Sequence, residues 1–133
     1  MSTLRQIVAA NDTIHTRYDA ATAVFTGATQ GVGLGTLKAF VRRVPHPTVV
    51  IVGRSRERFE EQFELLQSLN TEAKLVFVEG QVSLIKDVDA ISTQITHELP
   101  EKSVDFIFMA QGSTPIEGRR YTAEGLDEMM ALI

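Results

Sequence analysis

The chain has 133 residues, of which 44% are hydrophobic, so it can bury one modest core and is expected to form a single domain. Its net charge of -4 argues against nucleic acid as a partner, because phosphate backbones are bound by clustered Lys and Arg. The sequence has no cysteine and three scattered histidines, which argues against a disulfide framework and a metal site. The first ten residues include no long apolar stretch, so we expect a cytoplasmic protein without a membrane partner.

Residues 1–20 form a leading segment, in which Leu4 to Ala10 predict a short helix. Beyond it, short apolar runs alternate with longer amphipathic stretches, and this alternation predicts parallel strands joined by crossover helices. The four strands are predicted at 22–26, 48–53, 74–79 and 104–110. Each run has apolar side chains on both faces, so each strand is expected to be covered by helices on both sides of the sheet.

The stretches between these strands place apolar residues at helical spacing. The first helix is expected to end near Arg43, because Pro45 and Pro47 cannot continue it. The third is expected over about 83–98, with Pro100 just beyond its end. The three apolar stripes are Leu34, Leu37 and Val41; Phe59, Phe63 and Leu66; and Leu84, Val88, Ile91 and Ile95.

This order of elements predicts an α/β fold with a Rossmann-like, doubly wound parallel sheet of strand order 3-2-1-4. Ligands bind such sheets in the crevice at the carboxyl ends of the strands, at the point where the strand order reverses. The loops after Phe25 and after Met109 are therefore expected to face each other across that crevice.

A glycine-rich turn joins the first predicted strand to the helix that follows it. Glycines at this spacing let the chain turn sharply and let a pyrophosphate approach the unpaired N–H groups of the helix N-terminus. We interpret the turn as a dinucleotide cradle, and a tight turn without a ligand is the alternative. The residues of the cradle are Thr26, Gly27, Thr29, Gln30, Gly31, Val32 and Gly33.

Arg54 closes the second predicted strand, where an NAD-binding chain usually carries Asp or Glu for the ribose 2′-hydroxyl. A guanidinium at that place attracts a 2′-phosphate, which favours NADP(H). Ser55 adds a hydroxyl, and Arg58 follows a helical turn later. The alternative interpretation is that Arg54, Arg56 and Arg58 form a solvated helix start.

From about Thr22 to Leu132 the chain resembles the N-terminal part of the short-chain dehydrogenase/reductase family, in a fungal-type branch. The family signature T-G-x-x-x-G-x-G is matched by Thr26 to Gly33, and the family's strand-four ending Asn-Asn-Ala-Gly is matched in part at 110–112. The resemblance implies NADP (NADPH) as cofactor. Gln81 and Val82 would frame adenine in place of the family's Asp-Val. The nicotinamide ribose would be bordered by Ala110, Gln111 and Gly112.

The family's catalytic residues are a Ser and a Tyr-x-x-x-Lys pair, and the resemblance places them beyond Ile133. In this chain Thr22 stands at the Lys position after Tyr18, and Gly125 after Tyr121, so no catalytic residue is assigned. We expect a truncated NAD(P)-binding domain over 1–133, inactive by itself, whose longer form acts on a carbonyl or alcohol substrate. A non-catalytic module that binds a dinucleotide or docks on a partner is the alternative. The open edge of the fourth strand predicts self-association.

Overall fold

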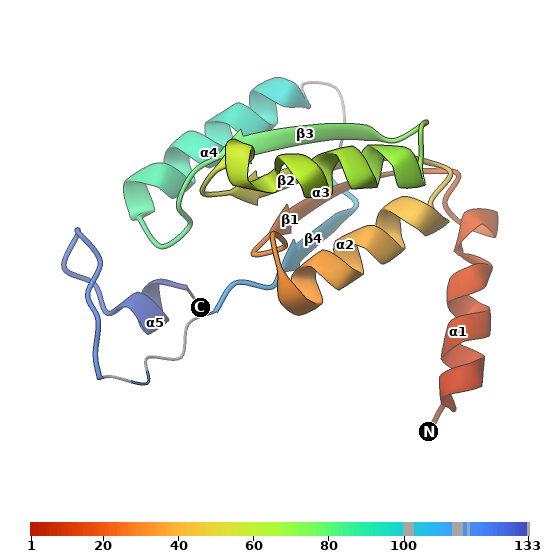
Figure 1. Ribbon diagram of the computed structural model, residues 1–133, viewed down its shortest axis with the longest axis horizontal. Helices are drawn as coiled ribbons and strands as arrows, with labels where there is room; N and C mark the ends of the chain where they lie inside the picture. Colours follow the sequence, from red (N-terminus) through yellow and green to blue (C-terminus); the bar gives the residue numbers. More distant parts are fainter. Residues whose placement is uncertain (100–102, 113–115, 117, 133) are drawn as a thin grey trace.

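The computed structural model describes residues 1–99, 103–112, 116 and 118–132. Its sheet has four parallel strands in the order β3-β2-β1-β4 (Figure 1), which confirms the predicted fold class and strand order. The elements are α1 (Leu4–Asp12), the 3-10 turn η1 (Ile14–Thr16), β1 (Ala20–Thr26), α2 (Gly31–Arg43), β2 (His46–Gly53), α3 (Arg56–Leu69), β3 (Lys74–Glu79), α4 (Ile85–Glu98), β4 (Phe106–Met109) and α5 (Glu128–Ala131).

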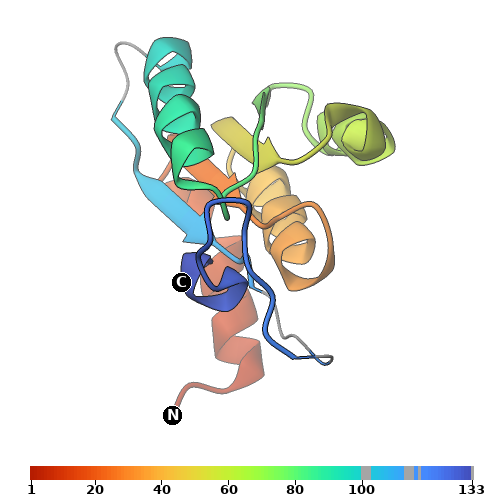
Figure 2. The ribbon, with the colours of Figure 1, turned by 90° about the vertical axis from the view of Figure 1, so that its left-hand side faces the viewer.

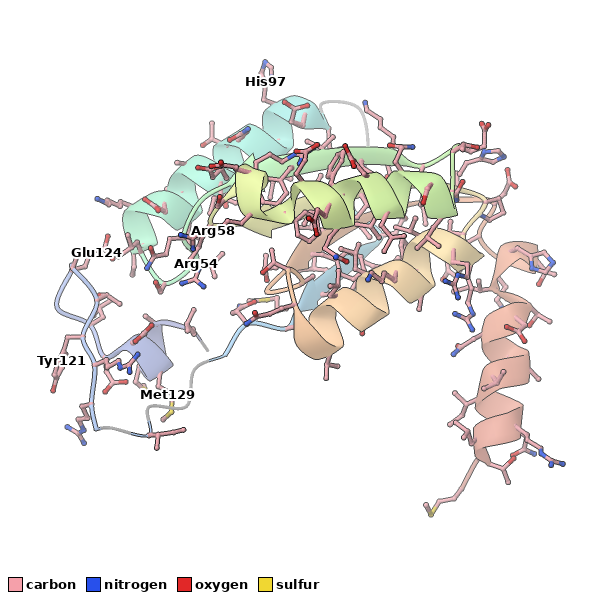
Figure 3. The ribbon with its side chains drawn as sticks, in the orientation of Figure 1. Arg54, Arg58, His97, Tyr121, Glu124 and Met129 are labelled. Carbon is pink, nitrogen blue, oxygen red and sulfur yellow. The ribbon has the colours of Figure 1, made fainter. Side chains whose placement is uncertain are left out.

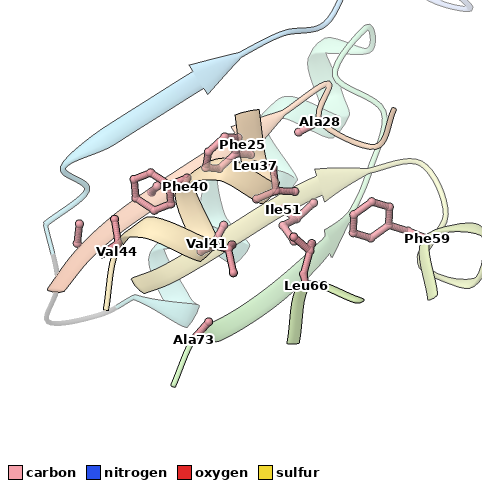
Figure 4. Packing of buried hydrophobic residues seen from close by; sticks show 13 residues of the cluster. Phe25, Ala28, Leu37, Phe40, Val41, Val44, Ile51, Phe59, Leu66 and Ala73 are labelled. Carbon is pink, nitrogen blue, oxygen red and sulfur yellow. The ribbon is translucent and has the colours of Figure 1, made fainter. Parts of the chain in front are cut away.

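The central strands β1 and β2 are buried along almost their whole length. Their alternate side chains point to opposite faces of the sheet, and helices cover both faces (Figure 2). Phe25 and its register partner Ile51 pack into the cluster that α2 and α3 cover, seen from close by in Figure 4. Val24 and its partner Val50 pack into a second cluster with Ile91 of α4. Because alternate residues of β1 and β2 pack into clusters on opposite faces, the sheet is the middle of three layers, with α2 and α3 on one side and α4 on the other.

The turn between α2 and β2 lies close to the position that Pro45 and Pro47 predict for it. α2 ends at Arg43, but β2 begins already at His46, so Pro47 lies inside the strand. Proline is accepted near the first residue of a strand, where its missing N–H removes little of the ladder. The side-chain amide of Asn70 holds this turn, because Nδ2 donates to the carbonyl oxygens of Val41 and Val44, each at 2.9 Å.

The edge strand β4 differs from the prediction. It is shorter than 104–110, and only one of its faces is covered. Phe108 stacks on Phe25 at 4.6 Å between ring centroids, whereas Ile107 and Met109 on the other face are 65% and 63% exposed. The expectation that every strand is buried on both faces is therefore wrong for β4, because no helix among the described residues covers its second face.

The leading helix α1 is confirmed and extends to Asp12. It begins with a capping box, in which the Thr3 hydroxyl accepts from the Gln6 N–H and the Gln6 side chain accepts from the Thr3 N–H. No residue of α1 is buried, and the ion pair between Asp12 and Arg43, at 3.5 Å, links it to α2. Among the described residues, no helix is long and apolar enough to cross a membrane.

Candidate functional site

A cleft of about 510 Å³ opens at the carboxyl ends of the strands, where the strand order reverses between β1 and β4. The loops that follow all four strands line it, together with two residues near α5. Thr26 and Ser55 lie outside the lining. The residues predicted from the sequence that do line it are Gly27, Thr29, Gln30, Gly31, Val32, Gly33, Arg54, Gln81, Val82, Ala110, Gln111 and Gly112.

The glycines of the turn after β1 serve different purposes. Gly27 has a φ of +69°, and a Cβ there would lie 2.2 Å from the backbone nitrogen of Gln111, so only glycine lets the loops after β1 and β4 meet. A Cβ on Gly33 would lie 2.6 Å from the carbonyl oxygen of Gly27. Gly31 also has a positive φ, of +58°, but a Cβ there would meet no atom within 4 Å. Of these three glycines, Gly31 is therefore the one with open space in front of it.

The first turn of α2 carries unpaired N–H groups into this space. Gln30 is the N-cap residue of α2, and its side chain makes no capping hydrogen bond. No acidic residue lies in the first turn of the helix. Since a helix N-terminus concentrates donors and partial positive charge, this end of α2 can accept an anion.

Thr26 and Gln111 join the two facing loops. The Thr26 hydroxyl donates to Oε1 of Gln111, and the Ala110 N–H donates to the Thr26 carbonyl oxygen at 2.9 Å. Gln111 stands where the resembling family has a structural asparagine, and here its amide oxygen still accepts a hydrogen bond from the neighbouring loop. Thr26 thus holds the wall of the cleft from behind rather than lining it.

The three arginines at the start of α3 have separate environments. The guanidinium of Arg56 pairs with Glu60 and lies 3.8 Å from the ring centroid of Phe63. The guanidinium groups of Arg54 and Arg58, by contrast, have no partner within the described part of the chain, and Arg54 lines the cleft. Figure 3 labels both at the end of the molecule that carries the cleft. Arg56 therefore has its charge paired on the surface of α3, with its side chain 32% exposed.

Ser55 is the N-cap of α3, since its Oγ accepts from the Arg58 N–H at 3.3 Å. A hydroxyl that accepts one hydrogen bond keeps its own proton for donation. The N–H of Arg56, the first residue of this helix, donates to Oε2 of Glu79 at 3.0 Å. The N-terminus of α3 is therefore capped internally, unlike that of α2.

The Gln81 side chain is oriented by hydrogen bonds within its own loop. Its Nε2 donates to Oγ of Ser83 at 2.7 Å, and its backbone N–H donates to Oδ2 of Asp87 at 3.1 Å. Because the amide nitrogen is engaged, the amide oxygen Oε1 remains as an acceptor. Val82 lines the cleft beside it.

Several residues that shape the cleft were missed by sequence reasoning. Gly53 and Gly80 end β2 and follow β3, and a Cβ on either would lie within 2.8 Å of a neighbouring side chain. Glycine at a strand end was a usable signal for both. Glu128 and Leu132 line the cleft from the last described segment, and no local pattern in the sequence indicates this.

Asp105, Tyr18 and Tyr121 have structural or exposed positions. Oδ2 of Asp105 accepts from the Thr22 N–H at 2.8 Å, so this carboxylate has a structural role at the start of β4. Tyr18 packs edge-on against Phe106, and Tyr121 is exposed. Among the described residues no group of His, Asp or Glu could hold a metal ion.

The fold defines the class of protein, a Rossmann-like α/β domain of the type found in short-chain reductases. A 3-oxoacyl-[acyl-carrier protein] reductase from Brucella melitensis is similar with a TM-score of 0.66 at 21% identity, over 84% of this chain and 44% of that one. L-Sorbose reductase from Gluconobacter frateurii, in complex with NADPH and L-sorbose, is similar with a TM-score of 0.65 at 21% identity, over 86% of this chain and 41% of that one.

In sequence, the chain is 41% identical over 110 residues to the oxidoreductase lepF of Aspergillus flavus. The match covers 83% of this chain and 30% of lepF, so the chain spans less than a third of that relative. No protein-family model matches the chain. The resemblance to a fungal-type short-chain dehydrogenase/reductase is confirmed: the chain has the fold of that family and is similar to part of a fungal oxidoreductase.

Proposed function

We propose that the cleft binds NADP(H). The observation that carries this proposal is the first turn of α2, uncapped by its N-cap side chain, in the same cleft as the unpaired guanidinium of Arg54. The N–H groups of Gly31, Val32 and Gly33 would receive the pyrophosphate, because a helix N-terminus stabilises an anion. Arg54 would pair with the 2′-phosphate, and the Ser55 hydroxyl would donate to it.

The other residues that line the cleft would fit the adenine end and the nicotinamide end of NADP(H). Oε1 of Gln81 would accept from the adenine amino group, with Val82 against the ring. Ala110 and Gly112 would border the nicotinamide ribose, where Gln111 is held by Thr26. When bound, the nicotinamide supplies hydride, and the residues of this chain bind and orient it.

Binding tests this proposal most directly. We expect the purified chain to bind NADPH more tightly than NADH in a fluorescence or calorimetric titration. Arg54→Asp should weaken NADPH by about 30-fold or more while changing NADH little, because the new carboxylate repels only the 2′-phosphate. The matched control is Arg5→Asp, on the exposed helix α1, which changes the charge equally. Equal affinity of the wild type for both nucleotides would remove the role given to Arg54.

For the longer protein we propose oxidoreductase activity on a carbonyl or alcohol substrate, as the names of its relatives and neighbours suggest. A module that binds a dinucleotide or docks on a partner without catalysis is the second candidate. NADPH oxidation by the longer protein with a panel of ketones separates the two, because only the oxidoreductase turns over. We expect no turnover from the 133-residue chain, and measurable turnover from it would overturn that expectation.

Self-association through β4 is a further part of the proposal. β4 pairs only with β1 among the described strands, and Ile107 and Met109 are exposed on its open face. An unpaired edge with exposed apolar side chains promotes association. Light scattering is expected to show a mass that rises with protein concentration, and a monomer at all concentrations would contradict it.

A further inference from the structure

A carboxylate from the end of the chain occupies the N-terminus of α4. Oε2 of Glu124 accepts from the Ile85 N–H at 2.7 Å, and Oε1 accepts from the Lys86 N–H at 3.1 Å. These are the first two residues of α4, whose own N-cap, Leu84, makes no capping hydrogen bond. The helix therefore receives its cap from a residue that is remote in sequence (Figure 3).

The loop that carries Glu124 is built to present it. The Leu126 N–H donates to Oγ1 of Thr122 at 3.2 Å, and the Thr122 N–H donates to the Leu126 carbonyl oxygen at 2.7 Å. Gly125 makes the tight turn between them, with a φ of +79° that favours glycine. Glu124 lies at the tip of this closed turn, so its backbone is held before its side chain reaches α4.

The residues that follow this turn reach the cofactor cleft. Asp127 caps α5, accepting from the N–H groups of Met129 and Met130. Glu128 and Leu132 line the cleft, as do Gln81, Val82 and Ser83 of the loop before α4. In Figures 1 and 2, α5 lies beside the segment that leaves β4. The segment 118–132 thus runs from the N-terminus of α4 to the cleft, and the carboxylate of Glu124 joins it to α4 by two hydrogen bonds.

We propose that Glu124 is a positioning residue for the dinucleotide, holding the segment 118–132 as a wall at the nicotinamide end of the cleft. This inference rests on the proposed NADP(H) binding. Without the carboxylate, the segment loses its two hydrogen bonds to α4. It keeps the cavity that Leu126 and Met130 line together with Ile85 and Val88, so the wall at Glu128 and Leu132 is held less firmly. The adenosine end is formed by the loops after β1, β2 and β3. Of these, the loop after β3 adjoins the helix end that Glu124 caps, but its Gln81 side chain is held within the loop by Ser83.

The test compares a ligand that has the nicotinamide half with a ligand that lacks it. In the 133-residue chain, Glu124→Ala is expected to raise the Kd of NADPH about fivefold, as when the docked fraction of the segment falls to about a fifth. The Kd of adenosine 2′,5′-bisphosphate, which lacks the nicotinamide half, should stay within about twofold. Glu124→Asp should restore part of the NADPH affinity, because it keeps the charge. The matched control is Glu64→Ala, an exposed glutamate of α3.

Amide exchange shows whether the contact itself forms. The N–H groups of Ile85 and Lys86 are expected to be protected in the wild type and in Glu64→Ala, and to exchange faster in Glu124→Ala. Equal exchange in all three proteins would overturn the inference. So would an equal loss of affinity for both ligands, or unchanged NADPH affinity in Glu124→Ala. If the wild type itself failed to bind NADPH, the proposed function would fall and this inference with it.

Discussion

The N-termini of α2 and α4 both lack a capping side chain on their own N-cap residue, and they differ in whether a carboxylate from elsewhere in the chain caps them. Each begins just after a strand of the same parallel sheet, and each has an N-cap residue, Gln30 or Leu84, whose side chain makes no capping bond. At α4 the carboxylate of Glu124 accepts from the first two N–H groups. At α2 an open space lies before Gly31 instead.

This difference supports the proposal that the N-terminus of α2 is the helix end that receives a ligand. The protein supplies an internal anion where a helix N-terminus is structural, as Glu124 does for α4 and Glu79 does for the Arg56 N–H of α3. A helix end left without such an anion, beside an unpaired arginine, is available to an external one. The open end of α2 is therefore the most informative feature of the cleft.

The largest expected effect separates the two positive-φ glycines of the α2 turn. Gly27→Ala should lower the free energy of unfolding by about 3 kcal/mol or more, because its Cβ would clash with the backbone at Gln111. Gly31→Ala should cost only about 1–2 kcal/mol, from the positive φ alone, while weakening NADPH about tenfold. Urea unfolding and NADPH titration measure both. Equal stability loss at the two positions would contradict the roles given to them.

Placing a carboxylate at the N-cap of α2 should cap that helix as Glu124 caps α4. Gln30→Asp is expected to stabilise the fold by about 1 kcal/mol as an N-cap. It should weaken NADPH by about 2 kcal/mol, roughly 30-fold, because the carboxylate opposes the diphosphate. Gln30→Asn caps without the charge and is the matched control, with a smaller loss of affinity. A gain in stability with unchanged NADPH affinity would place the diphosphate elsewhere.

The stabilisation that the Glu124 carboxylate gives to the N-terminus of α4 is expected to depend on pH. The pKa of Glu124 lies below its ordinary value of 4.5, because the N–H groups of Ile85 and Lys86 donate to the carboxylate. A lowered pKa in the folded state means that this stabilisation is complete above pH 4.5 and is lost as the pH falls through the lowered value. The Tm difference between the wild type and Glu124→Gln should therefore be constant at neutral pH and shrink below pH 4.5. The charged neighbours in the first turn of α4, Lys86 and Asp87, are the same in both proteins. A difference that grew on acidification would contradict this sign.

The smallest effect is expected from giving α4 a cap of its own. Leu84→Asp should stabilise the helix by about 0.5 kcal/mol and reduce the effect of Glu124→Ala on stability, because an N-cap carboxylate can also accept from the Lys86 N–H and acts on the same helix end. A double-mutant cycle by urea unfolding measures the coupling. Strictly additive effects would show that the two positions do not share the helix end.

Much of the fold and most of the cleft lining could be predicted from local patterns. Strand order 3-2-1-4 followed from the alternation of apolar runs and helical stripes, and the end of α2 at Arg43 followed from its prolines. The cleft followed from the glycine turn and from Arg54, since strand ends in such a sheet meet at one edge. These inferences succeed because backbone conformation and side-chain period are properties of neighbouring residues.

Only the tertiary structure decided which charged groups are engaged and which are free. Arg54, Arg56 and Arg58 read alike in sequence, yet Arg56 alone is taken up by Glu60 and Phe63. Glu124 carried no signal for its place on α4, and the uncovered face of β4 was predicted as buried. Such outcomes depend on distances between residues that are far apart along the chain, and only the packed molecule sets those distances.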